Sequence, residues 1–246
     1  MELELKKECL DTYELGEPQT LTQEETAETI VPDYCPDIAR IISAEGVVCL
    51  HGGTEQDGVT GTVRVTVLYT PENESGVRAL EFAMPFSAQG EGLAGCAHVV
   101  VETEIELLES RMLNPRKIFT RCKLVTHLAG CRKVCLTISS DAETDPALLV
   151  EKRCCGQTVS LLRQVAEKDL TFSETMSLSL GREGAAELLH CRANGIVTET
   201  KAIGNKLIFK GVFLVSALYR TIGGQLASAS AELPFSQIME TDSTEE

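Results

Sequence analysis

The chain contains no tryptophan, and aromatic residues make up only 4% of its 246 residues. Surfaces that bind sugars or single-stranded nucleic acid by stacking need several aromatic rings, and this composition supplies few of them. Basic residues are also scarce: 22 lysines and arginines stand against 37 aspartates and glutamates, for a formal net charge of -15. Because nucleic-acid backbones are bound through basic surface, we expect no nucleic-acid partner.

Long apolar segments are missing as well. No run of the sequence approaches the roughly 20 apolar residues that span a bilayer. The opening MELELKKECL has no apolar core of the kind found in signal peptides. We therefore expect no membrane span and a protein that is made in the cytosol. The hydrophobic fraction of 43% is still enough for a packed core, and the length suits one or two domains.

Motifs of common catalytic and metal sites are absent too. The sequence has no Walker-type phosphate loop, no HExxH and no GxSxG, and its four histidines are scattered. The ten cysteines form no CxxC pair, so we expect neither a metal nor a cofactor. Buried free thiols are one interpretation of the cysteines. Oxidative cross-linking, with Cys9, Cys154 and Cys155 as candidates, is the other, and it requires an oxidising environment.

What the chain does contain is a repeated pattern. GTVRVTVLY at 61–69 returns as GVFLVSALY at 211–219, and Pro-Phe-Ser at 85–87 returns at 234–236. Apolar residues alternate with others in both copies of the longer segment, which predicts half-buried strands. The predicted core positions are Val63, Val65, Val67, Phe213 and Val215. A repeat at a fixed spacing predicts duplicated modules, and such modules build surfaces more often than single catalytic sites.

Further strands and two helices are predicted around this repeat. Alternation over 98–108, 116–128 and 133–139 predicts three strands after the first Pro-Phe-Ser. A proline followed by isoleucines at helical spacing predicts a short helix over 36–42, and 185–189 has the same spacing. The second copy has no counterpart of the three later strands.

Together these patterns predict a mainly β (α+β) protein with a tandem duplication. The two modules are residues 1–147 and 148–246, each an antiparallel β-sandwich or open barrel with one short helix. The second module is expected to be truncated at its C-terminal end. Since an incomplete module exposes sheet edges, we expect a longer chain, a neighbouring molecule or the chain's own N-terminal strand to complete it.

The densest polar cluster is TIVPDYCPDIAR at 29–40. It contains five candidate contact residues, namely Asp33, Tyr34, Cys35, Asp37 and Arg40. One interpretation is a loop that enters a helix, with an aspartate at the helix N-terminus. The other is a specialised partner-contact surface, because the second copy has MSLSLGRE in its place. A catalytic role for Cys35 or the two carboxylates is a weaker alternative, because nothing in the sequence marks a catalytic partner.

The run VPDYCPDIARIIS, followed by GTVRVTVLY, MPFS and LNPRKIF, resembles the SPOCS-domain family of endospore-forming clostridia. KAIGNKLIFKGVFLVSALY followed by ELPFSQIME resembles a second unit of that family. The resemblance therefore covers nearly the whole chain. In the best-known architecture of the family, SPOCS units precede a C-terminal LysM domain, and that protein binds the ATPase of the coat basement layer. This sequence has no LysM domain, so that partner is not implied.

The resemblance implies a non-enzymatic structural or scaffold protein of the spore coat or exosporium. It would be made in the mother-cell cytoplasm and recruited to the forespore surface. Its partners would be other spore-coat or morphogenetic proteins, or further copies of the chain in a homo-oligomer. Two other functions stay open. A module that binds cell-wall glycan would need a groove lined with aromatic rings, and a cysteine-dependent enzyme would need Cys35 exposed beside a basic group.

Charge is distributed unevenly along the chain. Residues 1–45 carry twelve acidic and three basic side chains, whereas residues 188–238 carry two acidic and five basic ones. The simplest interpretation is ordinary solvated surface. The alternative is head-to-tail attraction between copies, because opposite patches on one molecule favour heterologous contacts.

Overall fold

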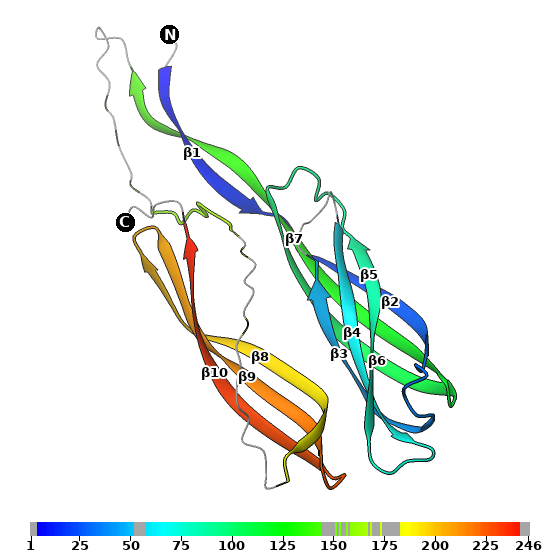
Figure 1. The fold of residues 1–246 in the computed structure, drawn as a ribbon. Helices are drawn as coiled ribbons and strands as arrows, with labels where there is room; N and C mark the ends of the chain where they lie inside the picture. Colours follow the sequence, from blue (N-terminus) through cyan, green and yellow to red (C-terminus); the bar gives the residue numbers. More distant parts are fainter. Residues whose placement is uncertain are drawn as a thin grey trace.

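The computed structural model of the chain describes residues 4–51, 58–143 and 183–241, together with scattered positions between 151 and 173. The described residues form ten antiparallel strands and no helix (Figure 1). The strands are β1 (Glu4–Leu15), β2 (Gln19–Ile30), β3 (Ile38–Leu50), β4 (Gly58–Pro71), β5 (Arg78–Gln89), β6 (His98–Asn114), β7 (Lys117–Glu143), β8 (Ala185–Ile203), β9 (Lys206–Thr221) and β10 (Leu226–Glu240). The mainly β prediction is confirmed. In the described part of the chain, no helix is long and apolar enough to cross a membrane.

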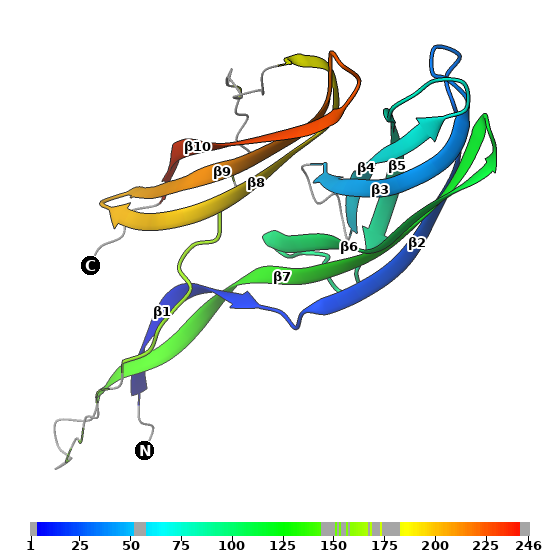
Figure 2. The same cartoon turned by 90° about the horizontal axis from the view of Figure 1, so that it is seen from below.

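Strands β1 to β7 form a first body, in which two sheets pack face to face (Figures 1 and 2). One sheet has the order β3-β4-β5, and in the other β7 pairs with β1, β2 and β6. The inward side chains of β4 at Val63, Val65 and Val67 are fully buried. They pack in one cluster with Ile118 and Leu124 of β7. The strand face predicted from the alternation in 61–69 is therefore confirmed.

The two predicted helices are wrong. Residues 38–42 begin β3, and 185–189 begin β8. The pairing of β3 with β4 shifts after Ile38 and again after Ile41, so each shift inserts one extra residue. A bulge of this kind changes the spacing of inward side chains from two residues to three. Ile38 and Ile41 can thus both contact the core from a strand, and their spacing imitates a helix.

β7 continues where two strands were predicted. The segments 116–128 and 133–139 belong to one strand of 27 residues. Its first half pairs with β2 on one edge and β6 on the other, and its second half pairs with β1. Beyond Cys131, β1 is the only described strand that pairs with β7, and the two strands leave the sandwich as a two-stranded arm (Figures 1 and 2).

Strands β8 to β10 form a second body, a single three-stranded sheet in the order β10-β9-β8. Among the described residues it has no second layer of its own strands, unlike the predicted sandwich or barrel. The expected core residues Phe213 and Val215 are only half-buried, whereas Ala217 and Tyr219 are buried.

The two three-stranded sheets share their pairing pattern. Bulges follow Ile38 and Ile41 in β3, and they follow Ala185 and Leu188 in β8. Both central strands also contain a glycine opposite a phenylalanine. A Cβ atom at Gly61 would lie 2.5 Å from the ring of Phe86, and one at Gly211 would lie 2.5 Å from the ring of Phe235. In each pair the absent side chain leaves room for the ring of the neighbouring strand.

We expect Val65→Asp to unfold the first body, because the new carboxylate would be buried among apolar side chains without a partner. The expected loss in free energy of unfolding is at least about 3 kcal/mol. The matched control is Arg64→Asp, which places the same charge on the exposed face of the same strand and should change stability by less than about 1 kcal/mol. Urea denaturation compares the two. Equal stabilities would show that the strand faces are misassigned.

The stability of the first body should fall at alkaline pH. Burial, and then the neighbouring Cys35, raise the pKa of Tyr69 from 10.0 to about 12. Because the pKa is higher in the folded state, the unfolded state loses its proton first, and the free energy of unfolding falls as pH rises from about 10 to about 12.

The substitution Tyr69→Phe should reduce this alkaline fall. The control Tyr34→Phe removes a hydroxyl from an exposed ring and should leave the fall as it is in the wild-type protein. Urea midpoints measured across this pH range test the expectation. An unchanged pH dependence in Tyr69→Phe would refute it.

Candidate functional site

The predicted contact residues lie mainly in the turn between β2 and β3, residues 31–37. Proline at 32 and at 36 restricts the backbone here, because each proline lacks an N–H and restricts the preceding residue. The backbone N–H of Cys35 donates a hydrogen bond to the carbonyl of Pro32 at 2.9 Å, which closes the turn. The segment is thus a tight turn between two strands and not a loop that enters a helix.

One arginine from a distant part of the chain holds this turn. The Nη1 atom of Arg116 donates to the carbonyl of Cys35 at 2.8 Å and to Oδ1 of Asp37 at 3.0 Å. Its Nη2 atom donates to the carbonyl of Val31 at 2.9 Å and to Oδ1 of Asp33 at 3.0 Å. A planar guanidinium suits such a fork of acceptors, and hydrogen bonds to charged groups are the stronger kind.

The turn between β6 and β7 presents this arginine. The side-chain carbonyl of Asn114 accepts a hydrogen bond from the backbone N–H of Arg116 at 2.9 Å, which fixes the local geometry. The backbone N–H groups of Val31 and Ile38 donate to the carbonyls of Arg116 and Pro115, each at 2.9 Å. Both ends of the 31–37 turn are therefore bound to the β6–β7 turn.

The structure thus brings Asp33, Cys35 and Asp37 together around one cation. Tyr34 lies at the tip of the turn, where its side chain is 88% exposed. Arg40 lies on β3 beyond the turn, and its side chain is also exposed. The sequence patterns include the segment LNPRKIF but do not predict the role of Arg116. The sequence does contain one indication of it, because two aspartates in one short turn need a cationic partner.

Cys35 is half-buried and packs against the core. It lies close enough to the hydroxyl of Tyr69 to raise the pKa of that group, and the hydroxyl donates to the carbonyl of Pro36 at 3.3 Å. Arg116 binds the carbonyl of Cys35 and not its thiol. This environment differs from the exposed thiol beside a basic group that a cysteine nucleophile needs.

The cysteines fall into different environments. Cys9 forms a disulfide with Cys135 in the arm, whereas Cys154 and Cys155 lie outside the described residues. Burial, and then Glu25, raise the pKa of the Cys122 thiol to about 11. Among the described free cysteines, Cys191 is the exposed one.

A groove of about 900 Å³ lies between the two bodies, lined by strands β3, β4, β5, β6 and β8. The described residues that line it include no aromatic ring, so they offer no stacking platform for a sugar. Nε2 of His190 lies 3.2 Å from a carboxylate oxygen of Glu45, but the alignment is too poor for a hydrogen bond. Glu187 joins the bodies beside the groove, at 2.8 Å from Arg220 and 3.7 Å from Arg78. These contacts between the bodies are polar.

Two other features of the first body resemble binding sites but lack the surroundings that such sites need. A groove of about 630 Å³ contains Phe119, but the guanidinium of Arg111 covers this ring at 4.9 Å from its centroid. The segment GEGLAG at 90–95 has the spacing of a dinucleotide-binding loop, but it joins the antiparallel strands β5 and β6. Such a loop needs a strand before it and a helix after it, so the match carries no function.

We expect Arg116→Ala to lower the free energy of unfolding by about 2 kcal/mol, because several charge-assisted hydrogen bonds are lost at a partly exposed site. Arg116→Lys should recover less than half of this, since an ammonium group cannot form the fork. The control Arg121→Ala removes a more exposed arginine, 2.6 Å from Glu24, and should lower stability much less than Arg116→Ala does. Urea denaturation measures all three. Full recovery by lysine would contradict the fork.

Comparison with known proteins identifies one segment. Residues 185–246 match the family model described as SipL, SPOCS domain. No curated protein and no solved structure matches the chain. The resemblance of the first body lies outside the matched segment and stays a prediction. The match indicates a sporulation-related role, and it shows that residues 185–246, which contain β8, β9 and β10, are similar to the SPOCS domain.

Proposed function

We propose that the protein is a non-enzymatic scaffold of the spore envelope, in the coat or exosporium, that acts through protein–protein contacts. The family match supports a role in sporulation. The observation that carries the proposal is the exposed ring of Tyr34 on a turn that Arg116 holds from several sides. The protein would be made in the mother-cell cytoplasm and recruited to the forespore surface.

An exposed tyrosine on a rigid turn suits a binding contact. Tyrosine is among the residues that contribute most to interface energies. A turn that is already ordered loses little conformational entropy when a partner binds. The neighbouring carboxylate of Asp33 is solvent-exposed while one of its oxygens contacts Arg116. The partner surface would therefore hold an apolar pocket for the ring with basic groups near its rim.

The correspondence between the two three-stranded sheets supports the tandem duplication. Strand order, the first two bulges and the glycine–phenylalanine pairs agree between β3-β4-β5 and β8-β9-β10, although β8 has a further bulge after Val197. We therefore retain the modules 1–147 and 148–246. A chain of related β-modules joined by polar contacts presents repeated surfaces, which suits a scaffold better than a single reaction centre.

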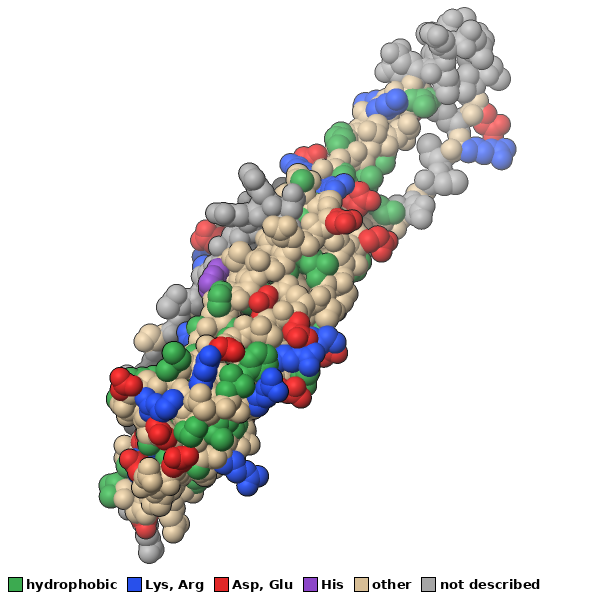
Figure 3. All heavy atoms as spheres, turned by 90° about the vertical axis from the view of Figure 1, so that its right-hand side faces the viewer, with side chains coloured by type: hydrophobic (Ala, Val, Ile, Leu, Met, Phe, Trp, Pro, Cys, Tyr) green, Lys and Arg blue, Asp and Glu red, His purple; other side chains and the backbone are tan. Residues whose placement is uncertain are grey.

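The partners would be other spore-coat or morphogenetic proteins, or further copies of the chain. On the face drawn in Figure 3, acidic and basic side chains lie intermixed. Some of the ion pairs link neighbouring strands, as Arg121 with Glu24 at 2.6 Å and Lys123 with Glu106 at 2.8 Å. These charges are already paired within the molecule. Recognition of a specific partner would therefore depend more on the turn that carries Tyr34 than on the net charge of residues 1–45 or 188–238.

In sporulating cells of an endospore-forming host, we expect a fluorescent fusion of the full chain to gather at the forespore surface. Tyr34→Ala should leave it diffuse in the mother cell, because loss of such an anchor costs about 2 kcal/mol or more, roughly 30-fold in affinity. Fluorescence microscopy measures the localisation, and thermal melting checks that the variant is folded.

The matched control is Ile222→Ala, which truncates another exposed apolar side chain, 76% exposed, in the second body. It should localise as the wild-type protein does. Normal localisation of a folded Tyr34→Ala variant would remove the turn from the contact. A wild-type fusion that never reaches the spore would reject the scaffold function itself.

A further inference from the structure

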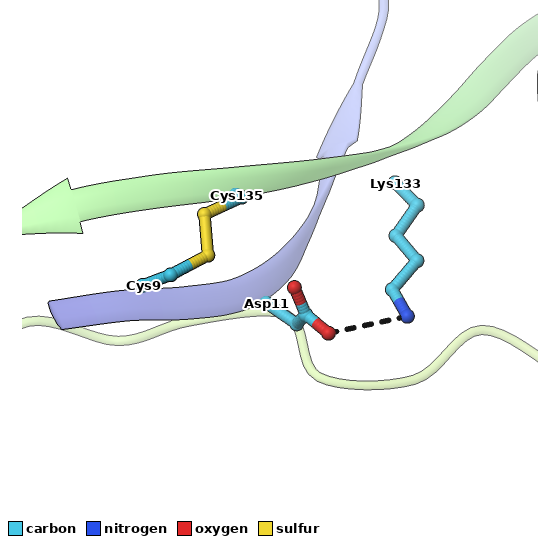
Figure 4. The surroundings of a disulfide bond; sticks show 4 residues. All are labelled: Cys9, Asp11, Lys133 and Cys135. Carbon is cyan, nitrogen blue, oxygen red and sulfur yellow. Dashed lines mark ion pairs between the residues drawn. A yellow bond between two sulfur atoms is a disulfide. The ribbon is translucent and has the colours of Figure 1, made fainter.

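One face of the arm holds three side chains that can bind a metal ion. Asp11 of β1 pairs directly with Cys135 of β7, and Cys9 lies two residues from Asp11 on the same face of β1. The two sulfurs and a carboxylate oxygen lie within 4.8 Å of one another, and all three side chains are exposed. Figure 4 shows the sulfurs bonded to each other, with Asp11 beside them and Lys133 paired with Asp11.

We propose that Cys9, Asp11 and Cys135 form a redox-gated site for a soft divalent cation such as Zn²⁺. When the disulfide is reduced, the site offers two thiolates and a carboxylate, a ligand set that zinc accepts in a tetrahedral geometry with water in the fourth position. Thiolates about 2.3 Å from such an ion lie about 3.8 Å apart. Rotation of the two side chains reaches this separation from Cα atoms 5.7 Å apart.

Electrons and protons are conserved in the change between the disulfide state and the metal-bound state. A dithiol reductant gives two electrons and two protons to the Cys9–Cys135 bond, which yields two thiols while the reductant becomes a disulfide. The thiols release their two protons when the cation binds. In the reverse direction the cation leaves, a small-molecule disulfide accepts two electrons, and the bond between Cys9 and Cys135 forms again. Either state links β1 to β7.

A link between β1 and β7 would stabilise the arm. An isolated two-stranded ribbon is marginally stable in water. Near its base, Tyr13 and Thr12 donate to the carbonyl of Leu162, from the backbone N–H at 2.7 Å and from Oγ1 at 3.1 Å. Farther out, the described contacts of β1 are with β7. The link between Cys9 and Cys135 sits in this outer part.

Charge and ligand type favour a soft cation. Nζ of Lys133 lies 3.3 Å from Oδ2 of Asp11, on the same face of β7 as Cys135. Together with a divalent ion, this ammonium group would balance the charges of the two thiolates and the carboxylate. Calcium and magnesium prefer oxygen ligands, whereas thiolates select zinc and similar ions.

Titration of the full chain with Cd²⁺, followed by thiolate-to-metal absorbance, tests the site. A phosphine keeps the protein reduced without competing as a thiol. We expect the reduced wild-type protein to bind Cd²⁺ with a signal that Cys9→Ser and oxidation both remove. Asp11→Asn, which keeps both cysteines and can still form the disulfide, should weaken binding by at least about tenfold. The control Cys191→Ser changes an exposed free cysteine and should bind as the wild-type protein does.

Three results would overturn the inference: no binding by the reduced protein, an equal signal from Cys9→Ser, or an affinity unaffected by Asp11→Asn. A loss of fold in Cys9→Ser would not remove the test, because Asp11→Asn and oxidised wild-type protein give independent measurements. The site does not depend on the scaffold proposal. Purified protein suffices, so failure here leaves the localisation experiment intact.

Discussion

The pairing of β7 with three other strands is the constraint on which the first body depends. β7 carries β2 and β6 along its first half and β1 along its second. Its buried side chains, including Ile118 and Leu124, supply the layer that closes the core against β4. The turn that presents Arg116 precedes it directly, and Cys135 lies near its other end. The Arg116-bound turn and the arm are thus connected by one continuous strand.

The Arg116-bound turn and the arm, which lie toward opposite ends of β7, are ordered by different interactions. At the Arg116 end, a cation fixes a turn by binding two of its carbonyls and two of its carboxylates. The arm has little buried apolar surface, and Leu5, Leu136 and Ile138 are exposed on it. Order there depends on the backbone ladder and on the disulfide between Cys9 and Cys135. The turn proposed as a partner contact and the arm proposed as a redox-gated site are therefore joined by one sheet.

Much of the strand structure followed from local patterns, because alternation reports directly which residues face a core. Val63, Val65 and Val67 illustrate this. The helix at 36–42 was mispredicted because bulges reproduce a three-residue spacing, which side-chain pattern alone cannot distinguish. β7 continues through Gly130, whereas the sequence predicted two separate strands on either side of this residue. A Cβ atom at Gly130 would lie 2.5 Å from the sulfur of Cys96, so this glycine marks close packing and not a strand end.

The candidate sites were harder to predict, because each joins residues far apart in the chain. Asp33 and Asp37 were visible as a cluster, but their partner Arg116 lies on a later hairpin. The bond between Cys9 and Cys135 spans a separation of 126 residues, and the spacing of ten cysteines does not specify their pairing. Only the sheet register brings these groups together.

The length of β7 has a mechanical consequence. Tension between the tip of the arm and the far end of the sandwich would act along the axis of this strand. The hydrogen bonds to β1, β2 and β6 lie across that axis, so they would be loaded together in shear and not opened one after another. The protein would therefore resist tension along the axis of β7 more strongly than forces that pull its neighbouring strands away from it.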